Sequence, residues 1–396
     1  MHIVHIIHSL NIGGAQKYMA ALIPPIENQK NYYSVIYSES TAENIREELS
    51  VKNVQIYKYP GSLPAFRPYR IYKYLKSFWK NYKSIRLLSL VRHINPDLIH
   101  IHHQKLAEVV DVLHICNALK IPLVWTIHGH VFSSQRALDA FAHEMIVASE
   151  KRLPVAITFV GRFPEYLNEV VKQSNVKIVH TPPGVCVTDF EIDDRYRECC
   201  RGEAEIPSDT FVIGNIGRLS REKGIDVLLN ASQNFVRPGL KYKLIIVGDG
   251  PERQYLEDLT SQLHINENVV FVGVTDNVKK FLALFDLYVQ PSRSEGLPIA
   301  ILEAMSAGIP TIATDVGGVS YAVKNLDTGI LIPPEDDHAL AAAILALMDD
   351  PETCRIMSVK AKIKISDFDI DRFREKFAMI YSDLFVTMAN ENPGSN

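Results

Sequence analysis

The sequence lacks the features that mark membrane-spanning and exported proteins. It has no run of eighteen consecutive apolar residues, so we expect no helix that crosses a bilayer. Its apolar start, MHIVHIIHSLNIGG, has neither a basic lead nor a small-residue cleavage site, and we expect a first β-strand there rather than a signal peptide. The five cysteines are odd in number and fit no disulfide or metal-binding spacing, which favours reduced thiols and a cytoplasmic location.

Two kinds of cofactor site are also missing. The glycine turns IGGA (12–15) and VGDGP (247–251) do not follow the G-x-G-x-x-G pattern, which argues against a nicotinamide-dependent enzyme. The segment DFDID (367–371) has a carboxylate spacing found in some metal sites. It lies directly before a helical segment, however, where Asp caps helices and favours the first turn. We therefore expect no metal site and no bound cofactor.

Short apolar runs, separated by helical stretches, recur along the 396 residues. Continuous apolar runs are typical of strands that are covered on both faces. The pattern predicts an α/β protein with two doubly wound parallel sheets, because a chain of this length exceeds one ordinary core. The strands are expected at residues 2–7, 32–37, 97–102, 123–128, 155–160, 176–181, 210–217, 243–250, 269–273, 287–292, 311–315 and 329–333.

The segment TPPGVCVTDF (181–190) and the polar residues after it interrupt this alternation. We expect an N-terminal Rossmann-like domain at residues 1–185 and a C-terminal one at residues 186–370, facing each other across a cleft. Ligands of such folds bind at the carboxyl ends of the strands, which would line this cleft. Residues 371–396 are expected to form a helix that crosses back to the N-terminal domain, followed by a flexible tail.

Charge is distributed unevenly between the two expected domains. Residues 1–185 contain 21 Lys and Arg against 13 Asp and Glu, whereas residues 186–396 contain 21 against 33. This asymmetry indicates that the N-terminal half faces an anionic partner.

The segment GRLSREKG (217–224) directly follows an expected strand. Gly217 allows the chain to turn, and Arg218 and Lys223 lie on the loop before a helix that opens at about Gly224. A helix N-terminus with two cations beside it suits a diphosphate. Ordinary solvation of a loop is the alternative, and the position at the carboxyl end of a strand favours phosphate.

The segment SEGLPIAILEAMSAGIP (294–310) contains a carboxylate in a helix that is otherwise small or apolar. Pro298 belongs in the first turn of that helix, so Glu295 lies on the preceding loop and Glu303 lies just over one turn inside. A buried ionised acid needs partners, which a salt bridge or the hydroxyl groups of a bound polyol could supply.

In this order and spacing, the segments resemble family 4 of the retaining glycosyltransferases, which have the two-domain GT-B architecture. EGLPIAILE (295–303) resembles the E-x7-E motif of that family. The similarity covers nearly the whole chain and includes IGGA, TIHG (126–129), PPGVCVTDF, GRLSREKG, VGDGP, PSRSEGLPIAILEAMSAGIPTIATDVGG (291–318) and TGILIPPED.

The resemblance implies a nucleotide-sugar site in the C-terminal domain. Arg218 and Lys223 would hold the donor diphosphate and stabilise its charge as it leaves. Glu303 would accept hydrogen bonds from both ribose hydroxyls, and Glu295 would bind a hydroxyl of the donor sugar. Glycine turns and backbone groups would complete the site, at Gly217, Gly248, Gly273, Val274, Gly296 and Leu297.

The resemblance also assigns residues of the N-terminal domain. Gly13 and Gly14 would let the backbone approach the donor phosphate. His128 would lie over the donor sugar or the acceptor, although a hydrogen-bonded packing role is the alternative. His102 and His103 are expected at the matching edge, where they would touch the acceptor. The implied reaction is a metal-independent front-face displacement, in which the departing phosphate oxygen takes the acceptor proton.

The segment RIYKYLKSFWKNYKSIRLL (70–88) predicts a basic amphipathic helix. Such a helix can lie on an anionic membrane, although a surface helix with solvated charges is the alternative. Nucleic acid is not an expected partner, because no nucleic-acid-binding module accompanies the helix. The residues expected at the membrane or acceptor are Arg70, Lys73, Lys76, Lys80 and Lys83.

These features predict a retaining hexosyl- or N-acetylhexosaminyltransferase whose donor is a UDP-linked sugar. Its acceptor would be a glycan or a lipid-linked molecule in the synthesis of envelope polysaccharide or lipopolysaccharide, at the inner face of the cytoplasmic membrane. A UDP-sugar 2-epimerase-like isomerase on the same scaffold and a non-catalytic nucleotide-sugar-binding protein are the alternatives. Product analysis without an acceptor separates the isomerase from the transferase.

Overall fold

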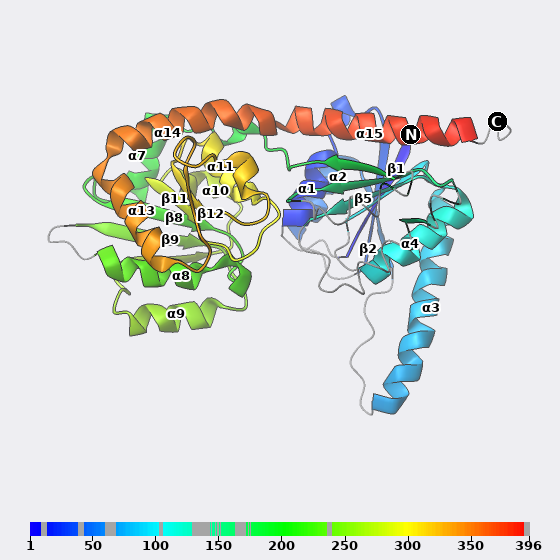
Figure 1. Cartoon of the computed structure of the whole chain (residues 1–396), viewed down its shortest axis with the longest axis horizontal. Helices are drawn as coiled ribbons and strands as arrows, with labels where there is room; N and C mark the ends of the chain where they lie inside the picture. Colours follow the sequence, from blue (N-terminus) through cyan, green and yellow to red (C-terminus); the bar gives the residue numbers. More distant parts are fainter. Residues whose placement is uncertain are drawn as a thin grey trace. The chain divides into compact units, whose positions relative to one another are not determined.

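The structure is a computed structural model. It describes residues 1–8, 14–38, 43–59, 69–102, 106–128, 152–162, 176–235 and 240–391, together with residues 143, 145, 146, 148, 150, 172 and 174. For residues 43–44, 69–81, 106–108 and 391 it describes the backbone alone. The chain forms two compact units, unit 1 (Met1–Thr181 and Phe373–Asn396) and unit 2 (Pro182–Arg372). Each unit is built around one parallel sheet (Figure 1).

Unit 1 has a seven-stranded sheet in the order β3-β2-β1-β4-β5-β6-β7, and all neighbouring strands pair in parallel. The order reverses between β1 and β4, as expected of a doubly wound sheet. Its strands are β1 (His2–Ile7), β2 (Tyr32–Tyr37), β3 (Gln55–Lys58), β4 (Leu98–Ile101), β5 (Leu123–Ile127), β6 (Val155–Phe159) and β7 (Lys177–His180).

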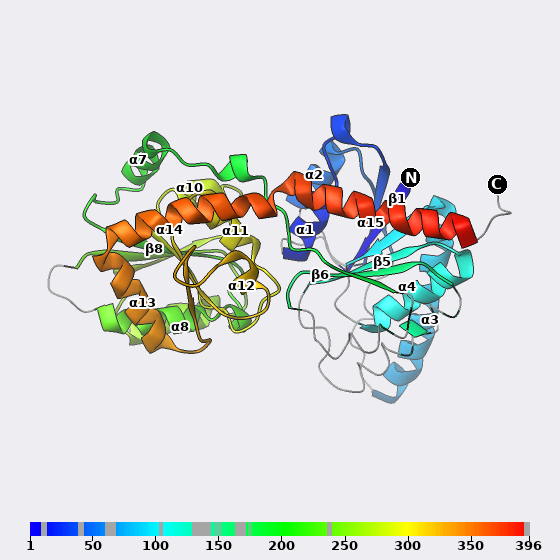
Figure 2. The same ribbon diagram turned by 45° about the horizontal axis from the view of Figure 1, so that its top comes forward.

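Helices cover both faces of this sheet. On one face, apolar side chains such as Val4 and Ile99 pack against α3 and α4 in a single hydrophobic core. On the other face, His100 contacts Phe377 and Tyr381 of α15, and His102 contacts Tyr18 of α1. Figure 2 shows α15 opposite α3 and α4. The helical segments are α1 (Gly14–Leu22), η1 (Ile26–Asn28), α2 (Glu43–Val51), α3 (Tyr69–Ile94), α4 (Leu106–Leu119) and α15 (Ile370–Glu391), which begins in unit 2.

Unit 2 has a six-stranded parallel sheet in the order β10-β9-β8-β11-β12-β13. Here the order reverses between β8 and β11. Its strands are β8 (Phe211–Ile216), β9 (Tyr242–Val247), β10 (Val269–Gly273), β11 (Leu287–Gln290), β12 (Thr311–Thr314) and β13 (Ile330–Ile332).

The helices of unit 2 lie on both faces of its sheet. In Figure 1, α8 and α9 lie below the sheet and α11 and α14 above it. Many of these segments are short: η2 (Val187–Phe190), α7 (Asp194–Glu203), η3 (Arg221–Lys223), α8 (Ile225–Ala231), η4 (Ser232–Phe235), α9 (Arg253–Gln262), α10 (Val278–Leu282), α11 (Ile299–Ser306), α12 (Val319–Ala322), α13 (Asp337–Asp349), α14 (Pro351–Lys364) and η5 (Ile365–Phe368).

All twelve strands expected from the sequence are present, with ends that differ by at most three residues. The sequence missed β3, an edge strand whose four residues QIYK are exposed or only partly buried. The basic segment does form a helix, α3. Within the part of the chain that the structure describes, no helix is both long and apolar enough to cross a membrane.

Phe377→Ala in α15 is expected to destabilise unit 1 by about 3–5 kcal/mol, because it removes a fully buried ring and leaves a cavity. Phe377 is 1% exposed, whereas Met379 on the same helix is 68% exposed. Met379→Ala is therefore the control, with an expected change within about 0.5 kcal/mol. Both tryptophans of the chain, Trp79 and Trp125, belong to unit 1, so tryptophan fluorescence in urea follows this unit. Equal stability of the two variants would contradict the packing described for α15.

Candidate functional site

The predicted donor residues lie where the strand order of unit 2 reverses. The chain leaves β8 through residues 217–224 and leaves β11 through residues 291–298. These strands are neighbours, and their connections go to opposite sides of the reversal point. Doubly wound sheets bind ligands at the carboxyl ends of two such strands. Arg218 and Lys223 on the first loop and Glu295 on the second therefore share one edge of one sheet.

An ion pair joins the two loops. Nζ of Lys223 lies 2.7 Å from Oε1 of Glu295. The side chain of Lys223 is 21% exposed and that of Glu295 is 8% exposed, so both charges are largely removed from water. Removing one partner of a buried pair typically costs about 3–5 kcal/mol, because the other charge is left uncompensated. The pair therefore fixes the relative position of the two loops.

Polar side chains from β11 and the loop after it orient the Glu295 carboxylate. Ser292 Oγ donates to Glu295 Oε1 at 2.7 Å, and Gln290 Nε2 donates to the same oxygen at 3.2 Å. Gln290 in turn accepts a hydrogen bond from the Tyr288 hydroxyl. Thr314 Oγ1 on β12 donates to the carbonyl oxygen of Ser292. Glu295 thus accepts from three donors through one oxygen, and this network was not expected from the sequence.

Arg293 makes a second connection between the two loops. Its guanidinium donates to both carboxylate oxygens of Asp226 at 2.8 and 2.7 Å. It also donates to Glu335 and to the carbonyl oxygen of Arg221, each at 2.8 Å. These hydrogen bonds, chiefly those to Asp226, raise the pKa of Arg293. Arg293 lies in the PSRSEG segment, but no local pattern pairs it with an acid 67 positions earlier.

Glu303 lies in α11 and is buried, with only 3% of the residue exposed. The helix begins at Ile299 with Pro298 as its N-cap, so Glu295 lies on the preceding loop as predicted. Burial raises the pKa of Tyr288 well above its usual value, and the nearby carboxylates of Glu303 and Glu295 raise it further. The structure therefore brings the two acids of the E-x7-E segment close to the same tyrosine.

Glycines at neighbouring strand ends form part of the same edge. The backbone N–H of Gly217 donates to the carbonyl oxygen of Val247, and that of Gly248 donates to that of Gly273. Gly248 has a φ of 132°, and a Cβ there would lie 1.8 Å from the carbonyl oxygen of Gly217. Only glycine fits this position, so the turn after β9 can lie directly against the loop that carries Arg218.

The other predicted residues of unit 2 lie around this edge. Arg218 is exposed, Leu297 is buried and Val274 is exposed. The carbonyl oxygen of Gly296 accepts a hydrogen bond from the N–H of Gly318. The helix after Gly224, α8, has only seven residues and follows the 3₁₀ turn η3. Its macrodipole is correspondingly small, so the cations Arg218 and Lys223 carry more of any anion binding than the helix does.

In unit 1, His128 directly follows β5 and is half-buried. Its Nε2 lies 3.2 Å from Nδ1 of His102, which is buried in the core. His102 therefore lies behind His128 rather than at the surface, and any direct contact with an acceptor would need a different conformation. Gly14 opens α1, while Gly13 and His103 lie outside the described residues, as do the side chains of Arg70, Lys73, Lys76 and Lys80. Lys83 is described and lies 5.6 Å from the centre of the Tyr59 ring.

Two family models match the chain. The model described as glycosyl transferases group 1 matches residues 197–364, and the model described as Glycosyltransferase Family 4 matches residues 12–154. Together the matched residues make up more than half of the chain, and they include most of the site. The chain therefore belongs to the group 1 glycosyltransferases of family 4.

Individual relatives and solved structures agree with this family. The chain is 28% identical to N-acetyl-alpha-D-glucosaminyl L-malate synthase of Bacillus anthracis, over 76% of this chain and 78% of that protein. It is 35% identical to the lipopolysaccharide core biosynthesis glycosyltransferase LpsD of Rhizobium meliloti, over 47% of this chain and 52% of that protein. The crystal structure of HepE from Anabaena in complex with UDP matches with a TM-score of 0.77 at 19% identity, covering 97% and 100% of the two chains. The expected GT-B fold is confirmed.

Gly248→Ala is expected to destabilise unit 2 by about 2 kcal/mol or more, because Cβ would strain the backbone and meet a carbonyl oxygen. Gly202 in α7 is the matched control, because a Cβ there would meet nothing within 4 Å. Gly202→Ala is expected to stabilise the same unit by about 0.5–1 kcal/mol. Scanning calorimetry measures both changes. A melting temperature of Gly248→Ala that equals or exceeds that of the wild type would contradict the close approach of the two turns.

Proposed function

We propose that this glycosyltransferase moves a hexosyl or N-acetylhexosaminyl group from a UDP-linked sugar to a glycan or lipid-linked acceptor, with retention at the anomeric carbon. The observation that carries the proposal is the Lys223–Glu295 pair at the reversal point of unit 2. It presents a cation suited to a phosphate oxygen and a carboxylate suited to a sugar hydroxyl, 2.7 Å apart. A nucleotide sugar has both groups next to each other, at the bond that breaks.

Donor binding would replace this ion pair with contacts to the substrate. The diphosphate would take Lys223 and the exposed Arg218, and a sugar hydroxyl would donate to Glu295. Glu295 would keep its hydrogen bonds from Ser292 and Gln290, so it remains oriented when Lys223 turns away. Exchange of one set of charged hydrogen bonds for another avoids the cost of burying an uncompensated charge.

The nucleoside would lie beside Glu303. A buried carboxylate is a strong acceptor for two adjacent hydroxyls, and the ribose offers such a pair. Gly273 and the exposed Val274 after β10 would contact the base through their backbone groups. HepE, which shares the fold, has been crystallised with UDP and with UDP-glucose, which supports UDP as the nucleotide.

The proposed reaction needs charge stabilisation and no metal. As the bond to the anomeric carbon breaks, negative charge develops on the leaving phosphate oxygen. The partly buried Lys223 and the exposed Arg218 would stabilise this charge. The same oxygen would accept the proton of the attacking hydroxyl on the same face of the sugar, which gives retention. Gly13, Gly14 and His128 of unit 1 would contact the donor phosphate and sugar.

The proposed acceptor belongs to an envelope polysaccharide or lipopolysaccharide, as the similarity to LpsD supports. Helix α3 suits such an acceptor at a membrane, because residues 69–94 contain several Lys and Arg and no Asp or Glu. In Figure 1 its N-terminal half extends away from the sheet of unit 1. We propose that this half lies on the anionic inner face of the cytoplasmic membrane, which would hold the enzyme near a lipid-linked acceptor.

Glu303→Gln is expected to weaken UDP binding about 10- to 100-fold, since hydrogen bonds to a charged group contribute about 1.5–3 kcal/mol. Calorimetric titration with UDP, in buffer containing EDTA, measures the change. Glu352→Gln is the control, because the Glu352 side chain is 63% exposed on α14, outside the proposed site. Equal affinities of the two variants would rule out the ribose contact. Binding by the wild type only with a divalent metal would contradict metal independence.

Replacing Lys73, Lys76, Lys80 and Lys83 with Gln is expected to abolish salt-sensitive binding to vesicles that contain phosphatidylglycerol. Each lysine near an anionic surface contributes about 1 kcal/mol, so binding should weaken by roughly three orders of magnitude. Co-sedimentation measures it, with vesicles of phosphatidylcholine alone as the background. The variant with Arg at the same four positions is the control, because it keeps the charge. If the Gln variant binds as well as the Arg variant, α3 is not the membrane contact.

A further inference from the structure

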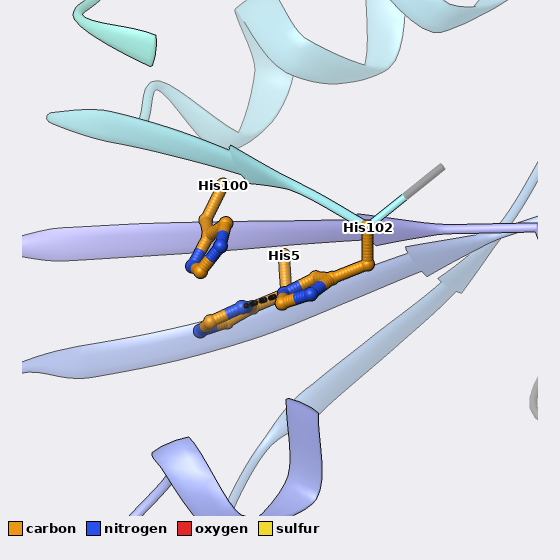
Figure 3. A group of neighbouring side chains, drawn as sticks. All are labelled: His5, His100 and His102. Atoms are coloured by element: carbon orange, nitrogen blue, oxygen red, sulfur yellow. Dashed lines mark hydrogen bonds between the residues drawn. The ribbon is translucent and has the colours of Figure 1, made fainter. Parts of the chain in front are cut away.

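Three histidines lie together inside unit 1, on the sheet face that α1 and α15 cover. His5 comes from β1, and His100 and His102 come from β4 and its carboxyl end (Figure 3). His5 and His100 are direct partners in the register of the two strands. All three side chains are buried, and His5 and His100 lie on the two strands between which the sheet order reverses.

A chain of hydrogen bonds leads from this cluster to His128. Nδ1 of His5 lies 3.0 Å from Nε2 of His102, the contact drawn as a dashed line in Figure 3. Nδ1 of His102 lies 3.2 Å from Nε2 of His128. At the inner end, Nε2 of His5 is buried without a hydrogen-bond partner. At the outer end, no described residue makes a hydrogen bond to Nδ1 of His128.

A metal ion fits this cluster poorly, although one ring nitrogen from each of His5, His100 and His102 lies within 4.8 Å of the others. Both nitrogens of His100 are engaged, Nδ1 with the Tyr381 hydroxyl at 2.7 Å and Nε2 with Thr126 Oγ1 at 2.6 Å. A metal needs the lone pair of a neutral imidazole, so His100 would have to give up one of these hydrogen bonds. His102 would also have to give up its hydrogen bond to His5 or its hydrogen bond to His128.

The hydrogen bonds instead couple the tautomers of three rings. Burial lowers the pKa of His5 to about 3 and lowers the pKa of His128 as well, so both are neutral near pH 7. A neutral imidazole has one N–H donor and one acceptor nitrogen. Each contact between two rings needs one donor and one acceptor. His102 is buried as well, which disfavours a charge on its ring. With three neutral rings, the protons can be arranged in only two ways that satisfy both contacts, and the tautomer of His5 then determines the tautomer of His128.

The inner end distinguishes the two orders. If His102 donates from Nε2, then Nδ1 of His5 is the acceptor and the proton of His5 lies on its Nε2. That buried N–H would have no acceptor. If His5 donates from Nδ1, the atom without a partner is an acceptor nitrogen. Buried N–H groups without a partner are rarer in proteins than acceptors that lack one. The second order is therefore favoured, and in it His102 donates from Nδ1 to Nε2 of His128.

We propose that His5 and His102 are positioning residues, which hold His128 in the tautomer protonated at Nδ1. His128 then presents an N–H donor beyond the end of β5, suited to an oxygen atom of the donor sugar or its diphosphate. The identity of that oxygen rests on the proposed function, whereas the tautomer does not.

Long-range ¹H–¹⁵N spectra of the full chain with ¹⁵N-labelled histidine, at pH 7 and without ligand, report which ring nitrogen is protonated. His128→Asn assigns the His128 signals. The wild type is expected to show His128 protonated at Nδ1. His5→Phe removes the partner of His102 Nε2, and the His128 signals should then shift towards a mixture of both tautomers. His5→Asn can place an amide N–H where Nδ1 was, so it should retain the wild-type signals.

His100→Phe is the matched control, because His100 belongs to the same cluster but not to the chain of hydrogen bonds from His5 through His102 to His128. It should leave the tautomer of His128 unchanged. The proposal is overturned if His128 of the wild type is protonated at Nε2. It is also overturned if His5→Phe keeps the wild-type His128 signals. If His5→Phe does not fold, the tautomer of His128 in the wild type and in His5→Asn still tests the proposal. If His128 of the wild type is protonated at Nδ1 but the protein does not bind UDP, the proposed function is contradicted and the positioning role of His5 and His102 is not.

Discussion

The ion pair between Lys223 and Glu295 is the constraint on which the site in unit 2 depends. It joins the loops after β8 and β11, which the doubly wound topology brings to one edge of the sheet. Most of the surrounding contacts either orient this pair or fix its loops. Ser292 and Gln290 hold the carboxylate, and the bidentate contact of Arg293 with Asp226 anchors the second loop to α8. These contacts orient the carboxylate and hold the two loops together in the absence of a ligand, and such preorganisation favours charge stabilisation.

Backbone geometry supports the same arrangement. Gly317 has a φ of 55°, and a Cβ there would lie 1.9 Å from the carbonyl oxygen of Glu295. The turn after β12 therefore packs against the backbone that carries the acid. Unit 1 uses its own reversal point differently, with neutral histidines from β1 and β4 in place of charges.

The sequence predicted those parts of the structure that depend on local patterns. Apolar runs located the strands because both faces of each sheet are covered, and the edge strand β3 was missed because it is half exposed. Pro298 correctly separated Glu295 from the helix of Glu303. The contact of Arg293 with Asp226 links residues 67 positions apart, so only the fold brings them together. The contacts of His102 with His5 and His128 likewise join residues from different strands, so the apolar run that contains His100 and His102 does not predict them.

A crystal structure of the chain with UDP tests the central claim most directly, because it locates the nucleotide atom by atom. The account predicts the diphosphate against Lys223 and Arg218 at the carboxyl ends of β8 and β11, with the ribose hydroxyls on Glu303. It also predicts that Lys223 has left Glu295, while Ser292 and Gln290 still hold the carboxylate. UDP bound elsewhere, or a diphosphate that leaves the Lys223–Glu295 pair intact, would contradict the assignment of this pair to the donor.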